Sequence, residues 1–191
     1  MSVTLHYDRV FTGNELQADG FAHAEFEQCT FRAGQWMGAD LTKARFTECV
    51  FEQCDLSNAV IAGTGFRQVE FKGCKLLGLQ FDQCNAFLLA MRFDHCRLDF
   101  ASFRSLVLKS TRITACSLVE TDFSGTDLGK AVLSDSDLAG AVFDGTNLEE
   151  ADLREARNYI IDPERNRVKR AQFSLHGLPG LLMRHGIRCS A

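Results

Sequence analysis

The sequence lacks the segments that would carry it into or across a membrane. No apolar run approaches the roughly 20 residues of a membrane-spanning helix. The start, MSVTLHYDRV, has neither the basic segment nor the apolar segment of a secretory signal. We therefore expect a cytoplasmic protein with no membrane contact. In that reducing compartment its 8 cysteines should be thiols.

The sequence also lacks the motifs of common enzymes. It contains no G-x-S-x-G, Walker A or H-E-x-x-H motif, and its 5 histidines are scattered. We therefore expect a protein that is not an enzyme and has no cofactor. Proline is scarce, with 2 residues, and the aromatic residues are 16 Phe against 1 Trp and 2 Tyr. This bias towards Phe indicates a repeated structural position.

Large apolar residues recur every five positions. Fifteen stand at this spacing from Phe11 to Phe81, and thirteen more from Phe93 to Leu153. A helix would give a period of 3.6 and an alternating strand a period of 2. The step from Phe81 to Phe93 is twelve residues, so two residues are inserted there.

A second, smaller residue precedes each large one by two positions. Ala, Cys, Ser and Thr dominate this position, with Val69, Leu79 and Leu106 as larger exceptions. Each unit of five therefore has one large and one small inward residue and three outward positions. The repeating signature is A/C/S/T-x-L/F-x-x.

This signature resembles the pentapeptide-repeat family over roughly residues 9–157. The resemblance implies an all-β fold, a right-handed quadrilateral β-helix in which four units of five form a coil of twenty residues. The 28 units would give about seven coils and a rod roughly 34 Å long. We expect two domains, the β-helix over 1–157 and a short strand-and-helix cap over 158–191 that also forms a dimer.

The spacing of Cys49 and Cys54, C-x4-C, is open to three interpretations: a metal site, a disulfide framework or core filling. Seven of the eight cysteines occupy the small inward position, which favours core filling because a buried thiol behaves as a small apolar group. Zinc needs ligands that converge on one point, and parallel stacked side chains rarely offer the dihedral angle of a disulfide. We expect no metal and, outside the pattern, one accessible thiol at Cys189.

The insertion interrupts the frame over residues 82–92. One interpretation is a bulged face that accommodates two extra residues. The other is a recognition loop, since loops on rigid scaffolds often carry function. The candidate contacts in such a loop are Phe87, Leu88 and Met91.

The C-terminal segment has the features of a cap. VKRAQF can form a short strand, Ser174 can cap a helix and Gly186 can end it. The segment resembles the C-terminal module of pentapeptide-repeat proteins that act on DNA gyrase, namely the albicidin and microcin immunity proteins and, more distantly, the Qnr proteins. In that group the module pairs two rods, although a plain monomeric cap remains the alternative, and His176-Gly177 departs from the group's pattern. The dimer contacts that the resemblance implies are Phe173, Leu175, Leu178, Leu181, Leu182, Met183 and Ile187.

Charge is distributed unevenly along the chain. Residues 1–156 contain 23 acidic and 14 basic residues, a balance of −9, whereas residues 157–191 contain 2 acidic and 7 basic residues, a balance of +5. An acidic rod could occupy a groove that normally binds the DNA backbone, or its acids could serve only solubility. We do not expect the chain to bind nucleic acid itself. The candidate partner-facing acids are Glu70, Asp82, Asp94, Asp99, Asp122 and Asp144.

By this resemblance the protein would mimic DNA, bind DNA gyrase, with topoisomerase IV as a second candidate partner, and protect the enzyme from poisons. It would act as a homodimer and without chemistry of its own, giving resistance or self-immunity. The alternative is a scaffold or adaptor with no topoisomerase partner, because a fold alone does not settle function.

Overall fold

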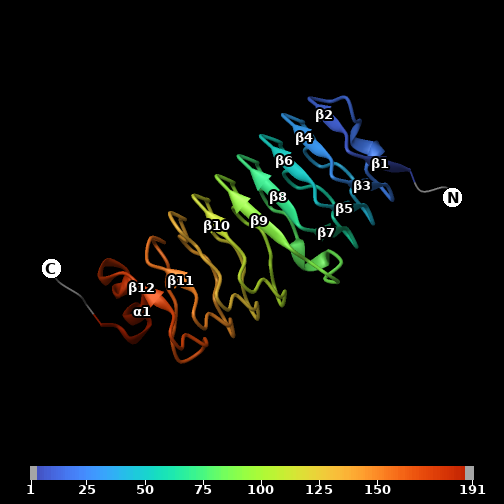
Figure 1. Ribbon diagram of the computed structural model, residues 1–191. Helices are drawn as coiled ribbons and strands as arrows, with labels where there is room; N and C mark the ends of the chain where they lie inside the picture. Colours follow the sequence, from blue (N-terminus) through green and yellow to red (C-terminus); the bar gives the residue numbers. More distant parts are fainter. Residues whose placement is uncertain (1–3, 188–191) are drawn as a thin grey trace.

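The chain forms an elongated rod of about eight stacked turns, as the computed structural model of residues 4–187 shows (Figure 1). Parallel strands make up its walls, so the predicted solenoid is confirmed. The estimate of seven coils falls short because pairing begins before Phe11 and continues beyond Leu153. The strands are β1 (Leu5–Tyr7), β2 (Val10–Thr12), β3 (Glu25–Glu27), β4 (Thr30–Arg32), β5 (Arg45–Thr47), β6 (Val50–Glu52), β7 (Gly65–Arg67), β8 (Val69–Lys72), β9 (Met91–Asp94), β10 (Ile113–Thr114), β11 (Asp152–Leu153) and β12 (Gln172–Phe173).

Each turn pairs with the next at an offset of twenty residues, or of twenty-two across the insertion. Sheets β1-β3-β5-β7 and β10-β9-β8-β6-β4-β2 are parallel, and Phe31 lies opposite Phe51, twenty residues on. Isolated parallel bridges, such as Gln35 with Asp55 and Asp122 with Val142, continue the same offset on the remaining walls. Four ladders therefore run along the rod.

We name the four faces by the large inward side chains that stack behind them. Because the chain visits the faces in the order A, B, C, D, faces A and C lie on opposite sides of the core. Face A has Phe11, Phe31, Phe51, Phe71, Phe93, Ile113, Leu133 and Leu153; face B has Leu16, Trp36, Leu56, Leu76, Leu98, Leu118 and Leu138; face C has Phe21, Leu41, Ile61, Phe81, Phe103, Phe123 and Phe143; face D has Phe26, Phe46, Phe66, Leu108, Leu128 and Leu148.

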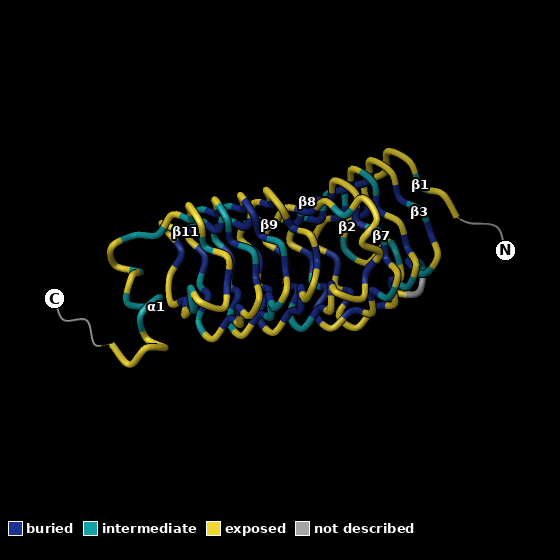
Figure 2. Tube along the Cα trace, turned by 90° about the horizontal axis from the view of Figure 1, so that it is seen from below, coloured by how far each residue is buried: buried dark blue, intermediate teal, exposed yellow. Residues whose placement is uncertain are grey.

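The core consists of these columns, and Figure 2 shows the buried inward positions alternating with exposed corners. On face A the rings of Phe31 and Phe51 stack with centroids 4.5 Å apart, and those of Phe51 and Phe71 lie 5.1 Å apart. Phe81 and Phe103 stack at 4.6 Å on face C. Offset-stacked aromatic pairs add stability beyond that of the buried area, so the excess of Phe is explained by the stacked columns.

The corners between faces place one residue in the left-handed region in most units. Non-glycine examples include Gln68 with φ 54° and Glu120 with φ 54°. An aspartate just before the inward residue supports many corners, because its carboxylate accepts a hydrogen bond from the backbone N–H two residues on. The bond from Ser124 N–H to Asp122, 2.8 Å long, is an example.

The coil offset continues past residue 157 towards the C-terminus. Asn147 bridges Arg167, and Leu153 in β11 lies opposite Phe173 in β12. The expected domain division at 157/158 therefore falls within a coil, and the cap proper begins after Phe173. Its helical segments are η3 (Leu175–Gly177), α1 (Pro179–Leu182) and η4 (Met183–His185); the short segments η1 (Ala18–Gly20) and η2 (Phe81–Gln83) lie within the rod.

The helical part of the cap begins and ends at the residues that the sequence predicts. The Oγ of Ser174 accepts a hydrogen bond from Gly177 N–H at 3.1 Å, and Gly186 ends the segment with φ 68°. Over residues 4–187 there is no helix with the length and apolar character needed to cross a membrane.

Candidate functional site

The two inserted residues form a protrusion between faces D and A. Asn85 still pairs with Gly65 at an offset of twenty, whereas Met91 pairs with Val69 at an offset of twenty-two. The extra length is therefore taken up within residues 86–90, the green bulge that precedes β9 in Figure 1. Asn85 Oδ1 accepts a hydrogen bond from Phe87 N–H at 2.9 Å and begins the turn.

The protrusion exposes apolar side chains. Phe87 is 77% exposed and Leu88 is 52% exposed, and Leu88 has a φ of 58°. Leu89 turns back and packs, half-buried, against the core. Exposed apolar residues on a rigid scaffold are typical of contact surfaces, so Phe87 and Leu88 stay candidates for recognition.

The structure corrects the prediction that Met91 is a contact residue of the loop. It lies in β9, pairs with Val69 and is only 3% exposed, so it cannot belong to an exposed recognition loop. It fills the small inward position two residues before Phe93. The spacing to Phe93 was the signal in the sequence that could have placed it.

A groove lies beside the protrusion, at the corner between faces D and A. Its volume is about 500 Å³, and its lining includes Glu48, Gln68, Leu89, Met91, Val107 and Lys109. No motif in the sequence predicts this groove, because its walls come from four successive coils.

The six candidate acids do not form one surface. Asp82, Asp122 and Asp144 each stand next to an inward Phe of face C. Glu70 and Asp94 stand in β8 and β9 on face A, the opposite side of the rod. A partner that contacts one side of the rod can reach only one of these two sets.

The structure also corrects the prediction that Asp99 faces a partner. It follows Leu98 on face B and is only 6% exposed. Its carboxylate accepts hydrogen bonds from the Ser117 hydroxyl and, at 3.2 Å, from Val119 N–H in the next coil. Asp99 therefore ties two coils together and is not part of an exposed acidic surface.

Much of the acidic excess has a local structural cause. Seven aspartates accept a hydrogen bond from the backbone N–H two residues on and so support a corner: Asp40, Asp55, Asp122, Asp127, Asp137, Asp152 and Asp162. Turns of this kind favour aspartate whatever the partner. An acidic balance in this fold is consequently weak evidence for mimicry of DNA.

Basic residues also neutralise several candidate acids. Asp122 pairs with Arg104 at 3.2 Å, and Asp144 pairs with Arg165 at 2.8 Å. Asp82 is exposed and, within residues 4–187, has no basic nitrogen within 4.0 Å. Of the face C set, Asp82 therefore carries the least compensated charge.

The candidate acids of face A lie among hydrogen-bond donors. Glu70 lies 3.1 Å from Lys72 Nζ, and Asp94 lies 3.1 Å from His95 Nδ1. The hydrogen bond from Thr114 and the neighbouring His95 hold the pKa of the Asp94 carboxyl below its ordinary value. Asp94 is therefore ionised at neutral pH, but its carboxylate already accepts a hydrogen bond from Thr114 and lies beside His95.

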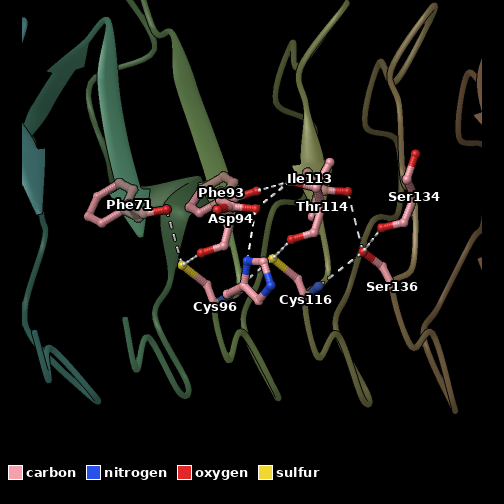
Figure 3. Close-up of polar contacts among 10 residues, drawn as sticks. Phe71, Phe93, Asp94, Cys96, Ile113, Thr114, Cys116, Ser134 and Ser136 are labelled. Atoms are coloured by element: carbon pink, nitrogen blue, oxygen red, sulfur yellow. Dashed lines mark hydrogen bonds and ion pairs between the residues drawn. The ribbon is translucent and has the colours of Figure 1, made fainter. Parts of the chain in front are cut away.

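The seven described cysteines are buried free thiols, as core filling predicts. Figure 3 shows Cys96 and Cys116 in one column that continues to Ser136, each bonded to backbone carbonyl groups. Burial raises the pKa of the Cys49 thiol to about 12. Across the described part of the chain, no three Cys, His, Asp or Glu side chains are grouped to hold a metal ion; Cys189 lies outside the described residues.

The residues expected at the dimer contact are divided between the rod end and the surface. Phe173 in β12 packs against the Tyr159 ring with centroids 5.6 Å apart, and Leu181 packs against the core; Leu182 is half-buried. Four others are exposed, namely Leu175, Leu178, Met183 and Ile187, with Leu175 at 84%. We call these four the cap patch.

Comparison with known families agrees with the repeat. A profile for the "Pentapeptide repeat region" matches residues 44–123, and the profile "Pentapeptide repeats (8 copies)" matches residues 21–58 and 116–155. The chain belongs to the pentapeptide-repeat family. Membership explains the period of five and the four-faced rod.

The sequence identity between this chain and individual pentapeptide-repeat proteins is low. The chain is 29% identical over 138 residues to "Quinolone resistance pentapeptide repeat protein QnrB96" of Scandinavium goeteborgense; the match spans 66% of this chain and 61% of that relative. Two trypsin-treated variants of QnrB1, "a plasmid-mediated fluoroquinolone resistance protein", share the fold with TM-scores of 0.64 and 0.65, 17% and 18% identity, and 98% coverage of both chains. At this identity the two structures establish the fold alone.

Proposed function

We propose that this pentapeptide-repeat protein binds DNA gyrase, and also topoisomerase IV, and protects the enzyme from poisons that trap cleaved DNA. The observation that carries the proposal is the match to a quinolone-resistance protein over 138 residues. The protein acts by binding alone, as a DNA mimic, and so gives resistance or self-immunity.

The filled core supports action without chemistry. Large side chains such as Trp36, Phe51 and Phe103 are less than 2% exposed, so within the described residues the interior of the rod leaves no room for a nucleophile and a base to meet a substrate. Its surface is a rigid scaffold that carries one protrusion. Such a surface suits competition with another macromolecule.

The acidic residues of face C are the part of the rod best placed to occupy a partner's site that normally binds the DNA backbone. Asp82, Asp122 and Asp144 are carried on one side, and Asp82 lacks a compensating base in the described residues. Such contacts weaken as salt rises, because exposed charges are screened. Phe87 and Leu88 would add apolar contact from the corner between faces D and A, which face D separates from face C.

We further propose that the cap patch pairs two copies. The exposed Leu175, Leu178, Met183 and Ile187 are apolar, whereas residues 157–191 carry 7 bases and 2 acids. Two caps would therefore repel electrostatically, and pairing should tighten as salt rises. Leu175→Asp should give a monomer in sedimentation velocity at micromolar concentration, whereas exposed Val142→Asp should not.

A gyrase assay tests the main proposal. Purified protein is titrated into supercoiling reactions with and without a gyrase poison, and linear cleaved DNA is measured. Less cleavage with supercoiling retained supports protection, whereas loss of both activities would indicate inhibition. If neither activity changes over a wide protein range, for gyrase or for topoisomerase IV, the proposal fails and a scaffold role becomes the better interpretation.

A further inference from the structure

The groove at the corner between faces D and A lies directly after the point where the chain gains two residues. On either side of the protrusion the corner residues follow one another coil by coil, from Glu48 through Gln68 and Ala90 to Ser110. Stacked coils are separated by about 4.8 Å, so three steps make the groove roughly 14 Å long, parallel to the rod axis. It crosses the strands and does not follow a strand edge.

The lining of the groove is apolar in the middle and oppositely charged at its two ends. Leu89 is half-buried and Ala90 is exposed, so both present apolar surface in the middle, and Val107, which is 65% exposed, adds apolar surface in the coil of Lys109. Glu48 belongs to the coil at one end, and Lys109 belongs to the coil at the other. Over residues 4–187 neither side chain has an oppositely charged partner within 4.0 Å; Glu48 accepts only a hydrogen bond from Gln28 at 3.1 Å.

The remaining charges at the groove already compensate each other. Arg92 lies 3.5 Å from Glu70, and Glu70 also lies 3.1 Å from Lys72. The charges available to an occupant are therefore Glu48 and Lys109. An occupant that complements them is positive at the Glu48 end, apolar in the middle and negative at the Lys109 end.

We propose that this groove is the docking site for a short segment of the partner topoisomerase that presents an apolar side chain between a basic and an acidic residue. The proposal rests on the function proposed above. Because the groove is half-open and its rim is charged, it suits side chains of a protein surface better than a free small molecule, which would need an enclosed and mostly apolar site. The adjoining exposed Phe87 and Leu88 also need a macromolecule to cover them.

The groove crosses the strands, so recognition there depends on side chains. The backbone groups along it already pair between coils: Val69 N–H donates to Ala90 O at 3.0 Å, and Glu70 N–H donates to Cys49 O at 3.0 Å. Addition of a partner strand is therefore not available at this site. Filling the groove should block docking without altering the protrusion.

The decisive variant is Val107→Trp, which fills the groove with an indole ring. Its matched control is Val10→Trp, because Val10 is also an exposed valine directly before an inward residue, but two coils before Glu48 and away from the acids of face C. Binding to gyrase is measured by surface plasmon resonance and protection by the cleavage assay. We expect Val107→Trp to weaken both at least 10-fold, and Val10→Trp to change binding less than 2-fold.

Two charge-reversal variants test the groove proposal if Val107→Trp does not fold. Lys109→Glu should weaken binding about 10-fold, whereas Lys43→Glu, an equal charge change at an exposed corner away from the groove, should not. If wild type binds and the folded groove variants bind equally well, the groove proposal is overturned while the gyrase proposal stands. If wild type does not bind gyrase or topoisomerase IV, both proposals fail.

Discussion

Replacing Asp99 tests whether this acid is structural or part of a recognition surface. Its carboxylate accepts hydrogen bonds from the Ser117 hydroxyl and from Val119 N–H. Asp99→Ala removes the Oδ1 atom that accepts both bonds and leaves the Ser117 hydroxyl and the Val119 N–H without this partner. Each hydrogen bond to a charged group contributes about 1.5–3 kcal/mol; because both donors are only half-buried, we take the lower end for each and expect a loss of about 3 kcal/mol.

Asp99→Asn separates shape from charge. The amide oxygen can still accept from Val119 N–H, and the lost ion pair with Arg97 is worth little because the Arg97 side chain is 59% exposed. We expect a loss of about 1 kcal/mol for this variant. For a chain of this length, about 3 kcal/mol corresponds to a decrease in Tm of roughly 6–12 °C.

Thermal and urea unfolding of wild type, Asp99→Ala and Asp99→Asn give these differences, and Asp82→Asn is the control. Asp82 is exposed, so its replacement should leave the Tm unchanged but reduce gyrase protection. Two results would refute the assignment of Asp99: an alanine variant as stable as wild type, or an asparagine variant that keeps full stability and loses protection.

Three further predictions concern the core and the charges. Phe51→Ala, in the middle of the stacked rings of face A, should cost about 3–5 kcal/mol in urea unfolding; a loss below about 1 kcal/mol would contradict close packing of the column. Thr114 and Arg154 lower the pKa values of Asp94 and Asp152, so their stabilisation is present above the unfolded value of about 3.9 and is lost as pH falls through the folded pKa. The free energy of unfolding should consequently decrease below about pH 4, and an increase there would oppose this assignment. In a Cys189→Ser variant the remaining thiols should not react with a thiol reagent until denaturant is added, since they are buried and the pKa of Cys49 is raised to about 12; rapid labelling of the folded variant would show that the columns are open.

The period of five predicts more of this structure than any single motif does. It gives the inward columns, the small positions filled by cysteine and the two-residue insertion. It succeeds because each unit repeats one backbone conformation, so the direction of a side chain depends on its place in the unit. The same rule, applied to Met91 through its spacing to Phe93, would have placed it inside.

The outward positions are less predictable. That a side chain points outward does not say what it contacts, because its neighbours are twenty or twenty-two residues away in the next coil. Asp99 shows this: the donors that it satisfies are Ser117 and Val119. Asp122 shows it differently, since one carboxylate supports a corner and pairs with Arg104.

The sequence by itself determined the solenoid, its core and the place of its interruption, because these follow from a local repeat and from the burial of one large side chain per unit. Only the tertiary structure decided which surface residues share a side of the rod. It placed Asp82 and Asp94 on opposite faces and assembled the groove from Glu48, Val107 and Lys109. The physical reason is the stacking of coils, which brings distant residues together at strand spacing and leaves adjacent units on different faces.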